Sequence, residues 1–389
     1  MDNNKYYTKS MVKKIIIGLT GLVIGVGIGV YFVSSQTSVP LPMKGQPKQV
    51  IGFLPYWLLN KAKKSYAGEI TTLTYFSLNA GNDGHIVKLA NQRQEEPGWY
   101  VLNSGAMNPF FTNARKNNIK LSLAVASGDS QAISQMIEKP TQNANNLISD
   151  VLPLMKKYHF QDLNLDIEDT AVPTQEEQTN FVQFIKTVKE QMDERKLGTL
   201  TIEITPTDVI IPSLINIQKV APYVNNIVIM AYDYHSSVSA VTGAVAPLTG
   251  AGVDSEYDVT TAVEKALQMT PSEKIILGMP LYGYEWQTLS TAIHSAVIPG
   301  TALTASNNRM QSLLSSCTSC SVFFDNESQE EFVVYRDPST ETFHQFYFPT
   351  QQTVTSTINL ANEKELNGVA LWALGYEGSS MLSPLTNYK

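Results

Sequence analysis

Four polar side chains, those of Asp162, Asn164, Asp166 and Glu168, alternate with large aliphatic ones in the segment FQDLNLDIEDT, residues 160–170. Asn164, Asp166 and Glu168 are two residues apart, and in a β-strand this spacing places side chains on one face. Two carboxyl groups at one end of a strand are suited to acid–base chemistry, because one can hold a proton while the other stays charged. The alternative is an ordinary half-exposed strand with a polar outer face, and the segment alone fits both interpretations.

The surrounding sequence favours the first interpretation, because eight short β-branched or aliphatic runs alternate with longer, mostly helical segments. This order predicts an α/β protein with the (β/α)8 TIM-barrel fold, in which catalytic side chains lie at the carboxyl ends of the strands. Asn164, Asp166 and Glu168 would then point into the barrel from strand four. The clearest helix is predicted at residues 174–196. The predicted strands span residues 49–57, 71–78, 119–126, 162–168, 199–206, 225–234, 274–284 and 367–374.

The widest gap between predicted strands, residues 285–366, contains three further strand-like pieces, SVFFD, EFVVYRD and FHQFYFP. We therefore expect a small α+β insertion at about residues 287–350, between strands seven and eight of a barrel domain that spans residues 50–389.

The N-terminal region contains an uncharged apolar segment, residues 15–33, preceded by four lysines and one aspartate. Nineteen helical residues span roughly 28 Å, about the thickness of the hydrocarbon layer. This predicts a transmembrane helix with residues 1–14 in the cytoplasm, residues 34–49 as a linker and the barrel outside. The alternative is a signal segment cleaved before Gln36, which would give a secreted protein.

The composition excludes several functional classes. The formal net charge is −7 and no block is rich in lysine or arginine, which argues against nucleic acid as a partner. The five histidines have no metal-ligand spacing, so neither a metal nor another cofactor is predicted. Cys317 and Cys320 form a C-x-x-C motif. A structural disulfide or two free thiols is preferred to a redox pair or half a metal site.

Several segments resemble glycoside hydrolase family 18, the chitinase-like family. FQDLNLDIE resembles its D-G-x-D-x-D-x-E signature on strand four, and IVIMAYDYH, residues 227–235, resembles its M-x-Y-D strand six. The segments IGFLPYW, ILGMPLYGYEW and GVALWALG resemble strands one, seven and eight. The likeness extends over residues 50–385 and is greatest to bacterial cell-wall and spore-associated N-acetylglucosaminidases.

The resemblance implies a retaining hydrolase that cleaves β-1,4 bonds next to N-acetylglucosamine, with the substrate's own acetamido oxygen as nucleophile. Glu168 matches the general acid, and Asp166 and Tyr232 match the residues that hold the acetamido group. Asn164 completes the catalytic set. The matched or expected substrate-binding residues are Asp233, Met230, Trp372, Tyr284, Trp286 and Tyr56. For the tyrosines and Trp286, core or rim packing is an equal alternative.

The sequence also departs from the family pattern. Asn164 stands where a second aspartate is usual, so the joint titration of an aspartate pair should be lost and Asp166 should ionise more readily. Burial and the nearby Asp166 should raise the pKa of Glu168. Ala124, Ala126 and Ser127 replace the usual S-x-G-G of strand three, which leaves that wall of the site undefined.

Two rival functions use the same residues. A non-catalytic, chitinase-like sugar-binding protein of the cell surface would keep the fold without turnover. A two-carboxylate glycosidase would use Glu168 with Glu285, although Glu285 also fits a salt bridge or a polar substrate contact. The expected partners are an N-acetylglucosamine-containing polymer, of peptidoglycan or chitin type, and the membrane at residues 15–33. No oligomeric state is predicted.

Overall fold

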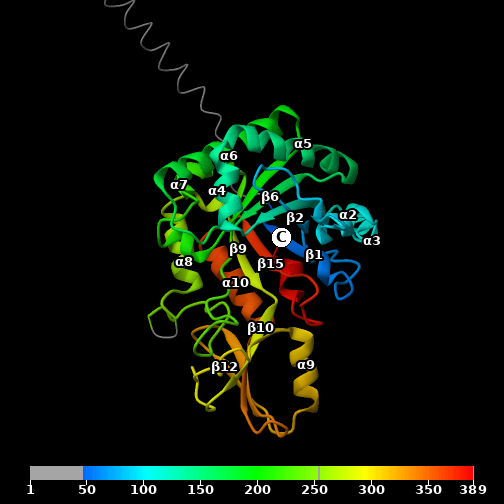
Figure 1. The fold of residues 1–389 in the computed structure, drawn as a ribbon. Coiled ribbons are helices and arrows are strands. Elements are labelled where there is room, and N and C mark those ends of the chain that lie inside the picture. The colour runs from blue at the N-terminus through cyan, green and yellow to red at the C-terminus, as the bar shows by residue number, and fades with distance from the viewer. Residues whose placement is uncertain (1–46, 253–254, 389) are drawn as a thin grey trace, which may run out of the picture. The chain divides into compact units, whose positions relative to one another are not determined.

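The structure, a computed structural model, describes residues 47–252 and 255–388, which form a closed barrel with an insertion (Figure 1). Neighbouring barrel strands are parallel, in the order β1-β15-β9-β8-β7-β6-β5-β2. Each of the eight predicted segments overlaps one of these strands, so the predicted barrel is confirmed. The strands are β1 (Gln49–Pro55), β2 (Thr72–Asn79), β5 (Lys120–Ser127), β6 (Asp162–Ile167), β7 (Thr199–Ile204), β8 (Asn226–Ile229), β9 (Ile275–Pro280) and β15 (Gly368–Trp372).

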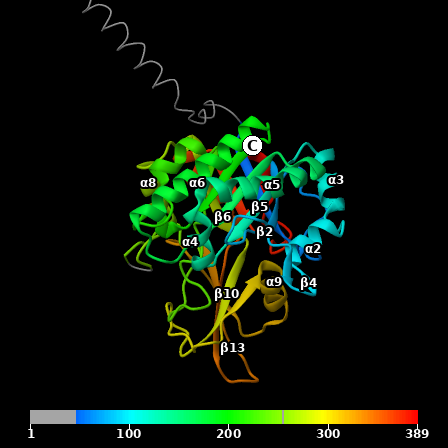
Figure 2. The same ribbon diagram turned by 45° about the horizontal axis from the view of Figure 1, so that its top comes forward.

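Helices surround the barrel, as both ribbon views show (Figures 1 and 2). The predicted helix at 174–196 is α6 (Gln175–Glu194), which begins at a capping box between Thr174 and Glu177 and buries Phe181 and Phe184. Such a cap typically contributes about 1 kcal/mol. The other helices are α2 (Pro97–Asn103), α3 (Asn108–Lys116), α4 (Ser130–Glu138), α5 (Pro140–Tyr158), α7 (Ile217–Val220), α8 (Val259–Leu267) and α10 (Gln351–Glu363).

Strand β6 separates its side chains as the alternation predicts. Leu163, Leu165 and Ile167 belong to the large apolar core between barrel and helices. Asn164 pairs in register with Ala124 of β5, which belongs to the separate apolar cluster inside the barrel. The polar face of β6 therefore points into the lumen, because side chains in register on parallel neighbours share a face.

The amino end of the lumen is closed by a hydrogen-bonded polar layer. Asp162 accepts hydrogen bonds from Ser122, Thr199 and Thr201. Burial raises the pKa of Asp162 to about 6, even though these hydroxyl groups favour its charged form. Asn226 extends the layer by donating to Thr201 and accepting from Gln49 and Asn367. The side chains of Asp162, Asn226 and their hydroxyl and amide partners therefore satisfy one another.

The insertion is a five-stranded antiparallel sheet with one helix, α9 (Asn307–Ser316). The sheet has the order β11-β10-β14-β13-β12. The first of its strands along the chain, β10, starts at Tyr282. The predicted strand at 274–284 is therefore divided between barrel strand β9 and insertion strand β10, and the insertion begins earlier than residue 287. The Leu281 N–H donates to the Trp372 carbonyl at the change of direction. The strands are β10 (Tyr282–Thr288), β11 (Leu303–Ser306), β12 (Ser321–Asp325), β13 (Glu330–Arg336) and β14 (Phe343–Phe348).

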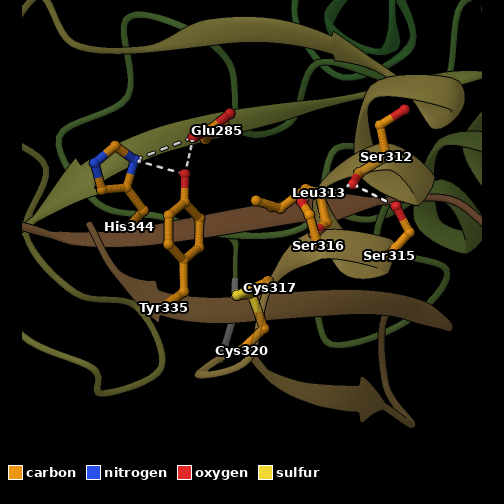
Figure 3. The surroundings of a disulfide bond; sticks show 9 residues. All are labelled: Glu285, Ser312, Leu313, Ser315, Ser316, Cys317, Cys320, Tyr335 and His344. Atoms are coloured by element: carbon orange, nitrogen blue, oxygen red, sulfur yellow. Dashed lines mark hydrogen bonds and ion pairs between the residues drawn. A yellow bond between two sulfur atoms is a disulfide. The ribbon is translucent and has the colours of Figure 1, made fainter. Parts of the chain in front are cut away.

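A hairpin of β3 (Leu89–Asn91) and β4 (Gln94–Glu95) was not predicted. The Cys317–Cys320 pair forms a disulfide just after α9, with a Cα–Cα distance of 5.7 Å (Figure 3). Within residues 47–252 and 255–388, no cluster of three or more histidine, cysteine or acidic side chains could hold a metal. The predicted span at residues 15–33 lies outside the described residues, and no helix within them is long and apolar enough to cross a membrane.

Candidate active site

The carboxyl ends of β6, β7 and β8 bring most of the predicted catalytic residues together. Asp166 lies in β6, where it pairs in register with Ala126, and Glu168 follows the strand, with its N–H donating to the Ser127 carbonyl at 2.9 Å. Tyr232 follows the end of β8. The side chains of Asp166, Glu168 and Tyr232 lie close enough to influence one another's titration.

Two cavities open beside Glu168. One of about 240 Å³ is lined by Glu168, Glu203, Asp208 and Met230. The other, of about 390 Å³, is lined by Glu168, Met230, Tyr232 and further residues of the loops after β7 and β8. Glu168 is accessible from both cavities, whereas Asp166 below it is only 4% exposed. This arrangement suits a proton donor that contacts a bound ligand.

The pKa of Asp166 is set mainly by burial. Burial, followed by the charge of Glu168, raises the pKa of Asp166 to about 8. The expectation that Asp166 ionises more readily beside Asn164 than it would beside an aspartate stays a prediction. Desolvation of the carboxylate is nevertheless the dominant influence on its charge.

The pKa of Glu168 is raised, as predicted. Burial is the largest cause, and the charges of Asp208 and Asp233 add to it, rather than Asp166 as expected. Burial, followed by the charge of Glu203, also holds the pKa of Tyr232 well above its usual value. The shift favours the protonated form of Glu168, which a proton donor needs, and Tyr232 remains a hydrogen-bond donor.

Glu203 is a site residue that the sequence reasoning missed. It lies on β7, is 2% exposed, and pairs in register with Val228, which lines the barrel lumen. Burial and the charges of Asp166 and Glu168 raise its pKa well above the usual range. The signal was present in TLTIEITP, where Thr199, Thr201 and Glu203 alternate as the polar residues of β6 do.

Asp233 is held by two tyrosines of the insertion. Tyr282 and Tyr284 both donate hydrogen bonds to its Oδ1, Tyr284 at 3.1 Å. Burial raises the pKa of Asp233, and the two hydroxyl groups oppose this shift. Asp233 has a φ of 62°, in the left-handed region that few residues other than glycine adopt. Tyr284 therefore positions Asp233, and its expected contact with substrate stays a prediction.

The remaining aromatic candidates divide into two groups. Trp372 lies among Phe53, Phe76 and Trp57 at the mouth of the barrel, and Tyr56 packs edge-on against Trp57 with ring centroids 4.8 Å apart. Trp57 is 49% exposed, which leaves an aromatic surface on this side.

Trp286 lies elsewhere. It is 0% exposed in the core of the insertion, where its indole N–H donates to the Ser236 carbonyl at 3.1 Å. It therefore offers no face to a substrate, and its predicted binding role is corrected.

Glu285 lies inside the insertion, on the opposite face of β10 from Tyr284 and Trp286. It forms an ion pair with Arg309 at 2.7 Å. It also accepts a hydrogen bond from Tyr335, and His344 Nδ1 lies 3.1 Å away (Figure 3). These partners outweigh burial and lower the pKa of Glu285 to about 2. Glu285 therefore has the salt-bridge role that the sequence left open, and its position does not support a second catalytic carboxylate.

Comparison with known proteins places this geometry in context. The profile of glycosyl hydrolases family 18 matches residues 43–377. A probable chitinase 2 of Drosophila melanogaster is 26% identical over 279 residues, which cover 66% of this chain and 56% of that protein. A cortical fragment-lytic enzyme of Bacillus subtilis is 24% identical over 336 residues, which cover 82% of this chain and 67% of that protein. The chain thus spans little more than half the length of the Drosophila relative.

Solved structures share the fold. The group IV chitinase of Ostrinia furnacalis, in complex with allosamidin, superimposes with a TM-score of 0.74 at 22% identity and covers 88% of this chain and 97% of that one.

Proposed function

The chain belongs to glycosyl hydrolases family 18, and from that premise we propose that it hydrolyses β-1,4 bonds next to N-acetylglucosamine. One observation carries the proposal. Glu168 reaches two cavities and has a raised pKa, and it lies beside the buried Asp166 and near Tyr232. A proton donor and two groups that can hold an acetamide are therefore present at one barrel end.

The proposed reaction is substrate-assisted and retains the anomeric configuration. Glu168 gives its proton to the leaving glycosidic oxygen while the acetamido carbonyl oxygen attacks the anomeric carbon and forms an oxazolinium ion. Asp166 accepts the acetamido N–H and Tyr232 donates to the carbonyl oxygen. Water then opens the ring and returns a proton to Glu168. General acid assistance of this kind contributes about 10²- to 10⁴-fold in rate.

The natural polymer proposed is peptidoglycan, with chitin-type oligomers as the second candidate. Support for the first comes from the Bacillus cortical fragment-lytic relative, and for the second from the Drosophila probable chitinase. Both polymers contain the N-acetyl group that the mechanism needs.

Mass spectrometry of the products tests this proposal. The purified full chain and its Glu168→Gln variant are incubated with muropeptides and with chitooligosaccharides. We expect the wild type to cleave one class next to N-acetylglucosamine and the variant to be impaired. Binding without cleavage by the wild type would favour a non-catalytic sugar-binding protein, and cleavage of substrates that lack the N-acetyl group would overturn the substrate-assisted mechanism.

We also propose that residues 15–33 anchor the protein with the barrel outside the cytoplasm. The support is the uncharged segment and the lysines before it. Protease treatment of intact cells, with antibody detection of the barrel, tests the arrangement. A barrel that is protected until the cells are lysed, or one released into the medium, would contradict it.

A further inference from the structure

Four buried polar atoms around Asp166, nearer the carboxyl end of the lumen, lack a hydrogen-bond partner of good geometry. They are both amide atoms of Asn164, Oδ1 of Asp166 and Oε1 of Glu203. These three side chains are 0%, 4% and 2% exposed. A buried polar atom without a partner is costly, so such a cluster calls for a physical account. The amino end of the same lumen shows the contrast, because Asp162 there accepts three hydrogen bonds.

Strand register brings Glu203 next to Asp166. Leu165 of β6 pairs with Ile202 of β7, so the next residue on each strand is Asp166 and Glu203. Both face the lumen, because Asp166 pairs with Ala126 and Glu203 with Val228. Two carboxylates cannot hydrogen-bond to each other when both are charged. One proton shared between them would satisfy the two unpartnered oxygens at once.

We propose that Glu203 supplies the carboxyl group that Asn164 lacks, and that Glu203 and Asp166 share one proton during the glycosidase reaction. Glu203 is then a positioning residue, which acts through Asp166. The pair carries one negative charge instead of two, which leaves Asp166 ionised in the fraction of molecules where the proton lies on Glu203. In that state Asp166 can accept the substrate's acetamido N–H. This inference rests on the proposed function, since it assigns a role within that reaction.

The surroundings of Glu203 favour a shared proton over a salt bridge. The titratable groups that influence it are Asp162, Asp166 and Glu168 from β6 and its end, and the Tyr232 hydroxyl after β8. The Asn164 side chain lies near enough to Glu203 to favour its charged form, but the raised pKa shows that burial and the acidic neighbours outweigh this contact. Asp208 lines the same cavity. Among the described residues, no lysine, arginine or histidine lines this cavity. A proton is therefore the available means of reducing the negative charge.

The test moves the carboxyl group between strands. Glu203→Gln keeps the size of the side chain but cannot lose a proton, and we expect it to lower kcat 10- to 100-fold with KM changed less than threefold. Asn164→Asp alone adds a third carboxyl group and should also lower kcat. The double variant N164D/E203Q restores the pair from one strand, and we expect it to recover at least tenfold over E203Q. A double variant no better than E203Q would overturn the proposal.

A matched control separates this role from a general effect of buried charge. Asp162 is another buried carboxyl group of β6, 6% exposed, at the opposite end of the lumen. Asp162→Asn should change kcat less than about threefold, because Asp162 acts on Glu203 through its charge alone and lines neither cavity beside Glu168. A loss in D162N as large as that in E203Q would count against a specific role for Glu203.

A second measurement does not need activity. Each proton held only by the folded state changes the unfolding equilibrium constant tenfold per pH unit, and stability then falls as pH rises. Between pH 6 and 8, the slope of the unfolding free energy against pH, measured with urea, gives the number of protons released on unfolding. This number should be about one smaller in E203Q than in the wild type, and N164D/E203Q should restore it. If no substrate is cleaved but this pattern holds, the proposed function fails and the shared proton stands. If the dependence is the same in wild type and E203Q, the shared proton is refuted.

Discussion

Glu203 and Glu285 are buried to nearly the same depth, 2% and 3% exposed, yet their titration shifts in opposite directions. In the barrel lumen, the pKa of Glu203 is raised by burial and by acidic neighbours. In the insertion, Arg309, Tyr335 and His344 contact Glu285 and its pKa falls to about 2. The difference shows that partners, rather than depth, decide the charge of a buried acid. The barrel keeps its acids short of partners at the end where a substrate would supply them.

The largest expected effect comes from comparing Glu168 with Glu285. Glu168→Gln should lower kcat on the cleaved glycan by about 10²- to 10⁴-fold, because it removes the proton donor. Glu285→Gln should change kcat less than about threefold, since Glu285 is a structural ion-pair residue. Steady-state kinetics on both variants measures this. Equal losses in the two variants would mean that the insertion takes part in the chemistry.

The next effect concerns the stability of the insertion. Arg309→Met leaves Glu285 buried with only Tyr335 and His344 as partners and should lower the free energy of unfolding by about 1–3 kcal/mol. Arg195→Met is a control, because its ion pair with Glu194 is exposed and 3.5 Å long, and it should cost less than about 0.5 kcal/mol. Urea denaturation compares the two. A negligible effect of R309M would show that the hydroxyl and imidazole groups alone hold the carboxylate.

The pH dependence of stability should have opposite signs in the two regions. The pKa of Glu285 is lowered, so its contribution is present above about pH 4.5 and is lost as pH falls toward 2. The pKa of Asp166 is raised to about 8, so the folded state keeps a proton that the unfolded state loses near pH 4. Stability from Asp166 therefore declines as pH rises from about 4 to 8.

Unfolding curves of Asp166→Asn and Glu285→Gln between pH 2 and 9 separate these contributions. In D166N, the decrease in the free energy of unfolding between pH 4 and 8 should be smaller than in the wild type by roughly 1 kcal/mol or more. E285Q should flatten only the loss at acid pH. A reversed assignment of the two slopes would refute the contrast between the regions.

The smallest expected effect concerns the hydrogen bond between the insertion and the barrel. Tyr284 reaches from the insertion to Asp233, and Tyr284→Phe removes one hydrogen bond but leaves that of Tyr282. The loss is worth about 0.5–1.5 kcal/mol, so we expect a three- to tenfold fall in kcat/KM. Tyr335→Phe, which removes a hydroxyl on the other face of the sheet, is the control and should leave kcat/KM unchanged.

Much of this arrangement was predictable from alternation alone. The polar and apolar residues of β6 fix which of its side chains enter the lumen, and the same rule would have found Glu203 on β7. What alternation cannot give is which polar group has a partner, because the neighbours come from other strands. Asp162 and Asp166 lie on one strand and one face, yet only Asp162 finds hydroxyl donors, supplied by β5 and β7.

The insertion was harder to predict for a related reason. Trp286 follows β9 closely in sequence and was expected beside the substrate. It is buried because β10 pairs with β14, where Trp286 aligns with Gln345 and the ring of Tyr347 packs against its indole. A contact across nearly sixty residues leaves no local signal in the sequence.

The closed polar layer at the amino end of the lumen determines which end of the barrel faces a support attached to the chain ahead of β1. Gln49 is the first residue of β1 and belongs to that layer, so the polypeptide enters the barrel at its closed amino end. The cavity lined by Glu168 lies at the opposite, carboxyl end. Any support attached ahead of Gln49, whether a resin, a fusion partner or a lipid surface, would hold the barrel by its base. The opening beside Glu168 would then be directed away from the point of attachment.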